Sequence, residues 1–166
     1  RRGSTRAGMG QGIQWVCAHQ LALRQPEAPA GYSGEGTAPA RFRLYFRDVG
    51  LCATAMGVPA SSLLRLERTL AVQRVVENTL AVTFAGNGYR LSYWSSGNKA
   101  VLAFLLEKGE EWIAIDMHFE EDKKSRSLFE FQKQAGRAEW TYRISEENFK
   151  RTERYSQIPY YAAFCI

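Results

Sequence analysis

The sequence lacks several features that would assign it to a function class directly. No segment approaches the ~20 apolar residues needed to cross a bilayer, and the longest apolar run, 100–106, has only the length of a strand. It has only 3 cysteines, far apart and without a CxxC pair. Such cysteine usage argues against a disulfide scaffold or a cysteine-rich metal site and is typical of a reducing compartment. We therefore expect a soluble, cytoplasmic protein with no membrane partner.

Two further signatures are missing from the N-terminal region. The first dozen residues are basic but have no apolar stretch, which argues against a secretory signal peptide. The phosphate-binding motif G-x-x-x-x-G-K-[ST] does not occur anywhere, so this chain has no such loop to hold a nucleotide. Glycines 8, 10 and 12 lie in a segment that we interpret as a flexible terminus. Because residue 1 is Arg and not Met, we also expect the chain to be a fragment of a longer protein.

What is present is typical of one folded domain. With 166 residues, 45% of them hydrophobic and 23% charged, the chain can bury a core without metal or disulfide support. The net charge of +5 is concentrated in the first 47 residues. A basic lead-in of this kind could contact phosphates, but a solvated flank explains it equally simply and is our interpretation.

Turn residues and hydrophobic periodicity divide the first half of the chain. The apolar stretch 13–23 predicts either a strand or the end of a truncated small module, and the Pro- and Gly-rich segment 24–40 predicts a loop. Alternation over 41–46 predicts a short strand with Phe42, Leu44 and Phe46 on one side. Asp48 is expected to cap a helix over 49–56. A longer helix is expected to begin at Ser61 or Ser62 and to end near residue 85.

The second half predicts three strands in close succession, then a helix and a strand. The strands cover 89–94, 100–107 and 112–119, and the turns between them are short enough for antiparallel hairpins. A helix over 127–135 crosses over to a strand over 139–144, which makes a mixed sheet the expected arrangement. The apolar tail 158–166 predicts a last strand or helix. The fold class is therefore α/β, with a mixed sheet flanked by helices.

The segment 112–119 contains the residues with the clearest chemical interest. Side chains of a strand alternate between its two faces, so Asp116 and His118 point the same way, beside a hairpin neighbour that carries Ala103. This arrangement is similar to a restriction-endonuclease-like core, in which an acid on the second strand, an acid-x-Lys pair on the third and a helix acid hold a divalent metal ion and a water. In that comparison Glu77 is the helix acid.

The same comparison indicates that the site has lost residues that catalysis requires. Ala103 stands where the family has a metal-ligating acid. His118 stands in place of the Lys, although an imidazole is mostly uncharged near neutral pH. Glu77 and Asp116 alone would make a weak Mg²⁺ site. We therefore predict no metal and no catalytic residues, and interpret Asp116 and His118 as paired with neighbours on a partly exposed sheet.

Several short stretches, in a shared order, resemble one known family. The chain is similar to the uncharacterised C-terminal domain of bacterial and archaeal AAA-type ATPases, which is described as restriction-endonuclease-like. The matching stretches are RLYFRDVGL at 43–51, VEN at 76–78, YWS at 93–95, SRSL at 125–128, RIS at 143–145, NF at 148–149 and IPYYAAF at 158–164.

The resemblance implies a restriction-endonuclease-like domain over 41–166, preceded by a basic, loop-rich lead-in over 1–40, for which the end of a truncated helical module is one interpretation. The family's Val-Asp-Phe appears here as Leu-Ala-Phe at 102–104 and its Glu-Val-Lys as Asp-Met-His at 116–118, so the departures fall at the active-site positions. The implied function is a non-catalytic accessory or regulatory domain that recognises a protein partner for an attached ATPase. ATP would bind only in that upstream domain.

Two alternatives remain open. In the first, the chain is a nucleic-acid-binding or residual metal-dependent nuclease domain, in which Glu77, Asp116 and His118 converge in a cleft lined by basic residues. The candidate nucleic-acid-binding residues are Lys99, Lys123, Lys124 and Arg126. Three acidic residues at 120–122 precede the last three of these, so a solvated turn before a helix explains them as well. In the second alternative the domain has a purely structural role.

Overall fold

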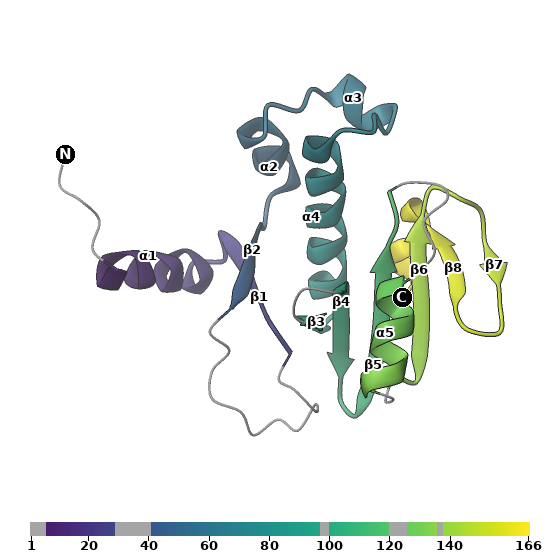
Figure 1. The fold of residues 1–166 in the computed structure, drawn as a ribbon. Helices are drawn as coiled ribbons and strands as arrows, with labels where there is room; N and C mark the ends of the chain where they lie inside the picture. Colours follow the sequence, from purple (N-terminus) through teal and green to yellow (C-terminus); the bar gives the residue numbers. More distant parts are fainter. Residues whose placement is uncertain (1–5, 29–40, 97–99, 120–125, 136–137) are drawn as a thin grey trace.

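The protein is a mixed α/β fold with one sheet of six strands and a second sheet of two strands (Figure 1). This computed structural model describes residues 6–28, 41–96, 100–119, 126–135 and 138–166. The helices are α1 Arg6–Ala18, α2 Val49–Ala55, α3 Ala60–Leu64, α4 Leu70–Gly86, α5 Arg126–Ala135 and the 3₁₀ helix η1 Tyr160–Cys165. The strands are β1 Ala22–Pro26, β2 Phe42–Phe46, β3 Arg90–Ser95, β4 Val101–Lys108, β5 Glu111–Met117, β6 Trp140–Ser145, β7 Lys150–Arg151 and β8 Ser156–Pro159.

The large sheet has the strand order β3-β4-β5-β6-β8-β7. Strands β3, β4 and β5 form an antiparallel meander, whereas β6 pairs parallel to β5, and β8 parallel to β6. A parallel neighbour requires a crossover, and α5 supplies it between β5 and β6. The expected α/β class and the expected order of helix, three strands, helix and strand are both confirmed.

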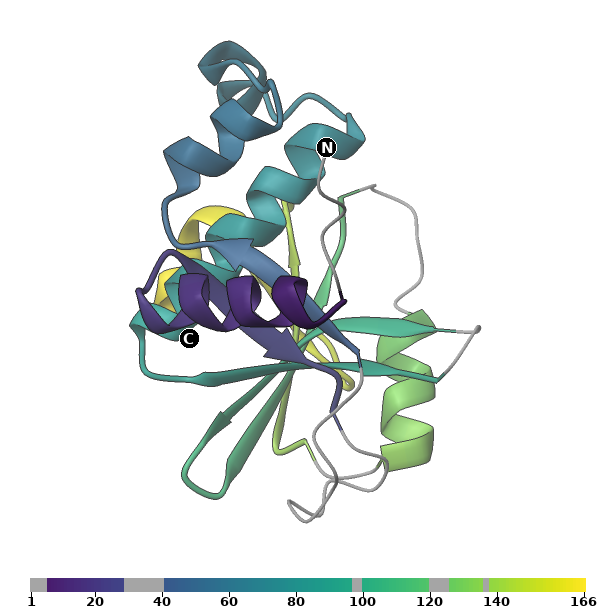
Figure 2. The ribbon, with the colours of Figure 1, turned by 90° about the vertical axis from the view of Figure 1, so that its left-hand side faces the viewer.

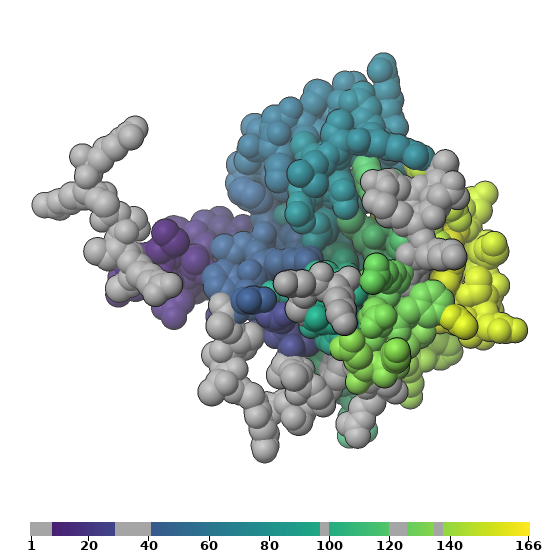
Figure 3. Space-filling view, in the orientation of Figure 1, coloured from purple at the N-terminus to yellow at the C-terminus, as the bar shows by residue number. Residues whose placement is uncertain are grey.

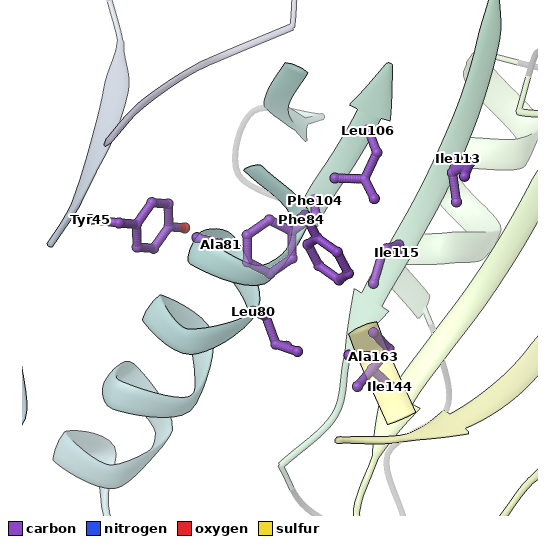
Figure 4. Packing of buried hydrophobic residues seen from close by; sticks show 10 residues of the cluster. All are labelled: Tyr45, Leu80, Ala81, Phe84, Phe104, Leu106, Ile113, Ile115, Ile144 and Ala163. Carbon is purple, nitrogen blue, oxygen red and sulfur yellow. The ribbon is translucent and has the colours of Figure 1, made fainter. Parts of the chain in front are cut away.

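Helices cover both faces of this sheet. On one face, Leu80 and Phe84 of α4 pack with Phe104 and Ile115 of the sheet, and η1 contributes Ala163 (Figure 4). On the other face, α5 packs its own apolar side chains against β4 and β5. Figure 2 shows α4 and α5 on opposite sides of the sheet. Side chains at the centre of the sheet, such as Phe104 and Ile115 on one face and Leu105 and Ala114 on the other, are therefore shielded from water.

The long helix expected from Ser61 or Ser62 is in fact two helices, α3 and α4. Leu66 between them has a φ of 46°, in the left-handed region, and Thr69 begins α4 by accepting a hydrogen bond from the Val72 N–H. This new start changes which residues face the core. Leu70 is 67% exposed, whereas Val72 is 1% exposed.

The two-stranded sheet also differs from expectation. Residues 24–26, expected in a loop, belong to β1, and β1 pairs antiparallel with β2 in the register Ala22↔Phe46. The proline is tolerated because it ends a strand that has only one partner in its sheet. The pairing joins residues from both sides of the boundary expected at 40/41. Part of the stretch 13–23 forms α1, which stands away from the rest of the molecule (Figure 3).

Strand β2 buries the face opposite to the one its sequence indicates. Leu44 and Phe46 are 42% and 39% exposed, whereas Tyr45 between them is 7% exposed. The tyrosine turns inward because its ring packs with the α4-side core and its hydroxyl has buried hydrogen-bond partners. The short edge strand β7 was not expected. The tail, for which a strand or a helix was expected, contains both the strand β8 and the helix η1.

No helix in the described ranges is long and apolar enough to cross a membrane.

Candidate functional site

Glu77, the helix acid of the predicted site, lies on the inward stripe of α4 and is only 4% exposed. Its Oε1 accepts hydrogen bonds from Arg43 Nη1 and from the Tyr45 hydroxyl, each at 2.9 Å. Its Oε2 accepts one from Arg74 Nη1 at 2.8 Å. Two guanidinium groups thus balance this buried carboxylate, as a buried charge requires. Both of its oxygens are already bound by the protein's own donors.

The Tyr45 hydroxyl connects Glu77 to the two-stranded sheet. It lies 2.9 Å from the Oε1 of Gln25 as well as from the carboxylate. Burial raises the pKa of Tyr45 above its ordinary value of 10.0, and the negative charge of Glu77 raises it further. The phenol therefore keeps its proton at neutral pH and acts as a hydrogen-bond donor within this buried network.

Ala103, at the position of the lost acid, lies in a β-bulge of β4. Strand β3 pairs Ser92 with Leu105 and Trp94 with Leu102, so one residue of β3 faces two residues of β4. Such an extra residue disrupts the ladder and re-aims side chains. Ala103 consequently packs against the α4-side core. The expectation that it lies beside Asp116 on one face is wrong, because the bulge interrupts the alternation of β4.

Gln25 from β1 fills the gap in the ladder at this bulge. Its Nε2 donates hydrogen bonds to the backbone oxygens of Ser92 and Ala103, both at 2.9 Å, and the residue is 0% exposed. These two carbonyls belong to the interrupted part of the β3–β4 pairing. Gln25, Tyr45 and Glu77 therefore form one hydrogen-bonded network that occupies the position where the predicted site has lost its strand acid.

Asp116 and His118 form a second, separate cluster. His118 Nε2 lies 2.7 Å from Asp116 Oδ2, and the Ser127 hydroxyl donates to Asp116 Oδ1 at 2.6 Å. The expected alternation of β5 is confirmed, since Ile115 faces the α4-side core while Asp116 contacts α5. The prediction of a partly exposed face is wrong: Asp116 is 4% and His118 9% exposed, because α5 covers this face.

The backbone of His118 is fixed as well. Its N–H donates to the Ile144 oxygen at 2.8 Å, continuing the parallel pairing of β5 with β6. Its carbonyl accepts a hydrogen bond from the Tyr160 hydroxyl. In a Ser-His-Asp catalytic triad the imidazole lies between the hydroxyl and the acid. Here Ser127 donates directly to Asp116, so the carboxylate holds both groups in place and does not orient an imidazole toward a nucleophile.

Arg143 is a buried site residue that the sequence reasoning missed. It is the register partner of Asp116 on β6 and is 8% exposed. Within the described ranges its Nε has no hydrogen-bond partner, and its Nη1 lies 3.4 Å from the Tyr155 hydroxyl. An arginine in the middle of the otherwise strand-like run WTYRIS was the available signal. Gln157, its partner on β8, is also buried and donates to Glu147 Oε2 at 2.7 Å.

The acids of the predicted nuclease-like site therefore do not converge. Glu77 belongs to α4 and Asp116 contacts α5, and these two helices lie on opposite sides of the sheet (Figure 2). Within the described ranges, no group of three or more His, Cys, Asp and Glu residues is placed to hold a metal ion. The arrangement supports two buried hydrogen-bond networks, one on each side of the sheet.

The basic candidates are only partly described. Lys99, Lys123 and Lys124 lie outside the described residues. Arg126 is described, and it is an exposed residue at the start of α5.

Comparisons of the chain with protein-family models, with curated proteins and with solved structures gave no match.

Proposed function

We propose that the chain is a non-catalytic recognition domain that binds a protein partner. One observation carries the non-catalytic part of this proposal: each carboxylate oxygen of the nuclease-like site accepts a hydrogen bond from a protein donor, and the two carboxylates lie on different sides of the sheet. Glu77 is bound by two arginines and a tyrosine, and Asp116 by a serine and a histidine.

The chemistry of phosphodiester hydrolysis explains why this observation argues against catalysis. A divalent ion that activates water needs hard oxygen ligands that converge on it with free lone pairs. Recruiting Glu77 would mean breaking contacts of 2.8 and 2.9 Å between this buried carboxylate and two partly exposed guanidinium groups. Recruiting Asp116 would strip buried His118 and Ser127 of their acceptor. Each step costs several kcal/mol, by analogy with opening other buried charge pairs, at about 3–5 kcal/mol.

The context of the proposal is an attached AAA-type ATPase. It rests on the motif stretches at 43–51, 93–95 and 158–164 and on the order of helix, meander, helix and strand, which a restriction-endonuclease-like domain shares. In this proposal the domain is accessory or regulatory, and ATP binds only in the upstream part of the longer protein. Reading the coding frame upstream of Arg1 tests this context. A phosphate-loop motif there supports it, and a stop codon immediately upstream refutes it.

A cleavage assay tests the non-catalytic part of the proposal. Supercoiled plasmid and single-stranded DNA and RNA are incubated with the chain in Mg²⁺ and in Mn²⁺, and we expect no cleavage. The restoration variant Ala103→Asp/His118→Lys, which reinstates the family's residue types, should also be inactive because the bulge keeps residue 103 on the α4 side. Metal-dependent cleavage by the wild type that Asp116→Ala abolishes would overturn the proposal. Activity of the restoration variant would overturn the argument that the bulge keeps residue 103 on the α4 side.

Nucleic-acid binding is the alternative outcome and has its own readout. If it is the function, binding to DNA or RNA weakens steeply with salt concentration and is lost in Lys123→Glu/Lys124→Glu. The matched control is Lys133→Glu, an exposed lysine in the last turn of α5. We expect no binding that distinguishes the double variant from this control.

A further inference from the structure

Strand β2 has an unpaired edge on the side away from β1. In an antiparallel pair, residues alternate between those that exchange backbone hydrogen bonds with the partner strand and those whose N–H and C=O point the other way. The Arg47 N–H donates to the Leu21 oxygen at 3.1 Å, so the odd-numbered residues of β2 bond to β1. The residues of β2 whose backbone groups point outward are Phe42, Leu44 and Phe46.

Only one end of this edge is occupied within the described ranges. The Phe46 N–H donates to Asn78 Oδ1 at 2.8 Å, and the Asn78 amide donates to the Phe46 oxygen at 3.0 Å. Asn78 of α4 therefore pairs with β2 as the backbone of another strand would, where β2 approaches α4 (Figure 1). The N–H and C=O groups of Phe42 and Leu44 form no hydrogen bond with the residues that the structure describes. Their donors and acceptors are available along one edge.

The other sheet edges in the described part of the chain are protected. Natural proteins blunt a free edge by short length, by charge or by covering it. Strand β7, at one edge of the large sheet, has 2 residues, and both are charged. Strand β3, at the opposite edge, is bridged by Glu27 at Tyr93 and by the Gln25 amide. The edge of β2 instead carries the exposed apolar side chains of Leu44 and Phe46.

An excess of positive charge lies at the same edge, on the inner face of β2. Arg43 and Arg74 both bind the single carboxylate of Glu77, and both guanidinium groups are partly exposed. Two cations thus share one anion. The next cation along β2, Arg41, has an acid opposite it in the pairing with β1, because the Glu27 N–H donates to the Arg41 oxygen. The uncompensated charge therefore belongs to Arg43 and Arg74.

We propose that this edge of β2 is the docking site for an extended segment of a protein partner, which adds a strand to the two-stranded sheet. This inference rests on the proposed recognition function and names its surface and the chemistry of its partner. The backbone of the segment pairs with Phe42 and Leu44, and its side chains alternate between the two faces. In this mode of binding the backbone supplies affinity and alternate side chains supply specificity.

The sequence of the segment follows from the residues it faces. Its residue opposite Arg43 points to the inner face, where charge complementarity selects an acid. Its two flanking residues lie on the outer face beside Phe42 and Leu44, and apolar side chains there extend the apolar surface of β2. The expected pattern is an acid between two apolar residues.

The same charges argue against a second copy of β2 as the occupant. The two-fold pairing that uses both free residues places Phe42 opposite Leu44 of the second copy, about an axis at Arg43. The two Arg43 side chains are then directly opposite each other, and like charges in that position destabilise a strand pair. A partner strand with an acid there is attracted instead.

Amide hydrogen exchange, measured residue by residue by NMR, tests the edge in the free chain. We expect the amides of Phe42 and Leu44 to exchange much faster than those of Arg43 and Tyr45, which bond to β1. A protected Leu44 amide in the free chain would mean that the edge is already covered, and it would overturn the inference.

Selection of random linear peptides, displayed on phage, against the intact chain tests the partner. We expect enriched peptides to carry an acid between apolar residues and to bind more weakly at high salt, because exposed charges are screened. Synthetic copies, measured by fluorescence anisotropy, should protect the Phe42 and Leu44 amides. N-methylation of a peptide residue that pairs with β2 should weaken binding about tenfold, as expected for one lost hydrogen bond. N-methylation of the residue between should have little effect.

Two variants of one residue test the same hydrogen bonds from the side of the protein. Leu44→Pro removes an edge N–H without removing a bond to β1, a position at which a strand tolerates proline. It should weaken peptide binding at least about tenfold. The matched control Leu44→Val keeps both the N–H and an apolar side chain and should bind as the wild type does. If Leu44→Pro does not fold, the N-methylated peptides decide alone.

Other outcomes overturn the inference. Failure to enrich any peptide, enrichment of basic peptides, or binding that is insensitive to N-methylation removes the proposed strand pairing. Peptides that bind without protecting Phe42 and Leu44 place recognition elsewhere and leave the proposed function intact. A dimer in sedimentation equilibrium that Leu44→Pro dissolves identifies a second copy as the occupant. The cleavage assay above decides separately whether the non-catalytic proposal fails.

Discussion

Replacement of Asp116 distinguishes a structural carboxylate from a metal ligand, because the two roles predict opposite changes in stability. In an empty metal site, carboxylates held close together repel one another, and removing one relieves that repulsion. Asp116 instead accepts hydrogen bonds from Ser127 at 2.6 Å and from His118 at 2.7 Å while 4% exposed. Its removal takes one acceptor away from the buried His118 and from the half-buried Ser127, so the free energy of unfolding should fall.

The expected size follows from these contacts. Removing the acceptor of a hydrogen bond to a charged group costs about 1–3 kcal/mol for each donor left behind, so Asp116→Ala should lower the unfolding free energy by about 2–5 kcal/mol. Asp116→Asn keeps one carbonyl oxygen for Ser127 and should cost about 1–2 kcal/mol. Ser127→Ala removes only the hydroxyl donor and should cost about 1 kcal/mol. A whole domain is stable by only about 5–15 kcal/mol, so these differences are measurable.

The assay is urea unfolding followed by tryptophan fluorescence and circular dichroism, with and without Mg²⁺. The control is Glu153→Ala, an exposed acid whose loss should change stability by less than about 0.5 kcal/mol. The reasoning is refuted if Asp116→Ala is as stable as the wild type or more stable. It is refuted equally if Mg²⁺ stabilises the wild type and not the variant, since a ligand that binds only the folded state raises its stability.

Three further predictions follow from the other buried groups. Gln25→Ala should lower the free energy of unfolding by about 2–4 kcal/mol, because two carbonyls at the bulge lose their donor. Amide hydrogen exchange in β3 and β4 should become faster, and unchanged exchange there would contradict this role. The raised pKa of Tyr45 means that the folded protein keeps a proton that the unfolded chain loses above about pH 10. Stability should therefore fall as the pH rises above that value, and less steeply in Tyr45→Phe; equal slopes would show that another group is responsible. Arg143→Met should leave the free energy of unfolding unchanged or raise it by about 1 kcal/mol, since a cation without an ion-pair partner in the described structure is replaced by an apolar chain. A large loss of stability in urea unfolding would mean that the guanidinium has an ion-pair partner.

Local patterns predicted much of the fold because they depend on nearest neighbours in the chain. Asp48 caps α2 by accepting a hydrogen bond from the Leu51 N–H, as the position of an acid before an apolar helix indicates. The two faces of β5 follow from strand alternation alone, and Ile115 and Asp116 do lie on opposite faces. The helix expected from residue 61 is divided for a local reason as well, since Thr69 caps the start of α4.

Other features depend on residues that are far apart in the sequence. The sequence of β2 alternates apolar and polar residues, yet Tyr45 is buried and Leu44 is exposed, because distant partners decide which face is covered. Gln25 meets Ala103 across 78 residues, and Arg43 meets Glu77 across 34. No period within one strand or helix encodes such contacts.

The sequence by itself determined the α/β class, the order of the central elements and the pair of residues, Asp116 and His118, that share one face of β5. Only the tertiary structure decided what those residues do. The bulge in β4 turns Ala103 to the α4 side, and helices on both faces of the sheet bury the two acids separately. Whether a carboxylate is a ligand or a buried hydrogen-bond acceptor depends on which donors reach it, and for Glu77 and Asp116 those donors include side chains from other strands and helices.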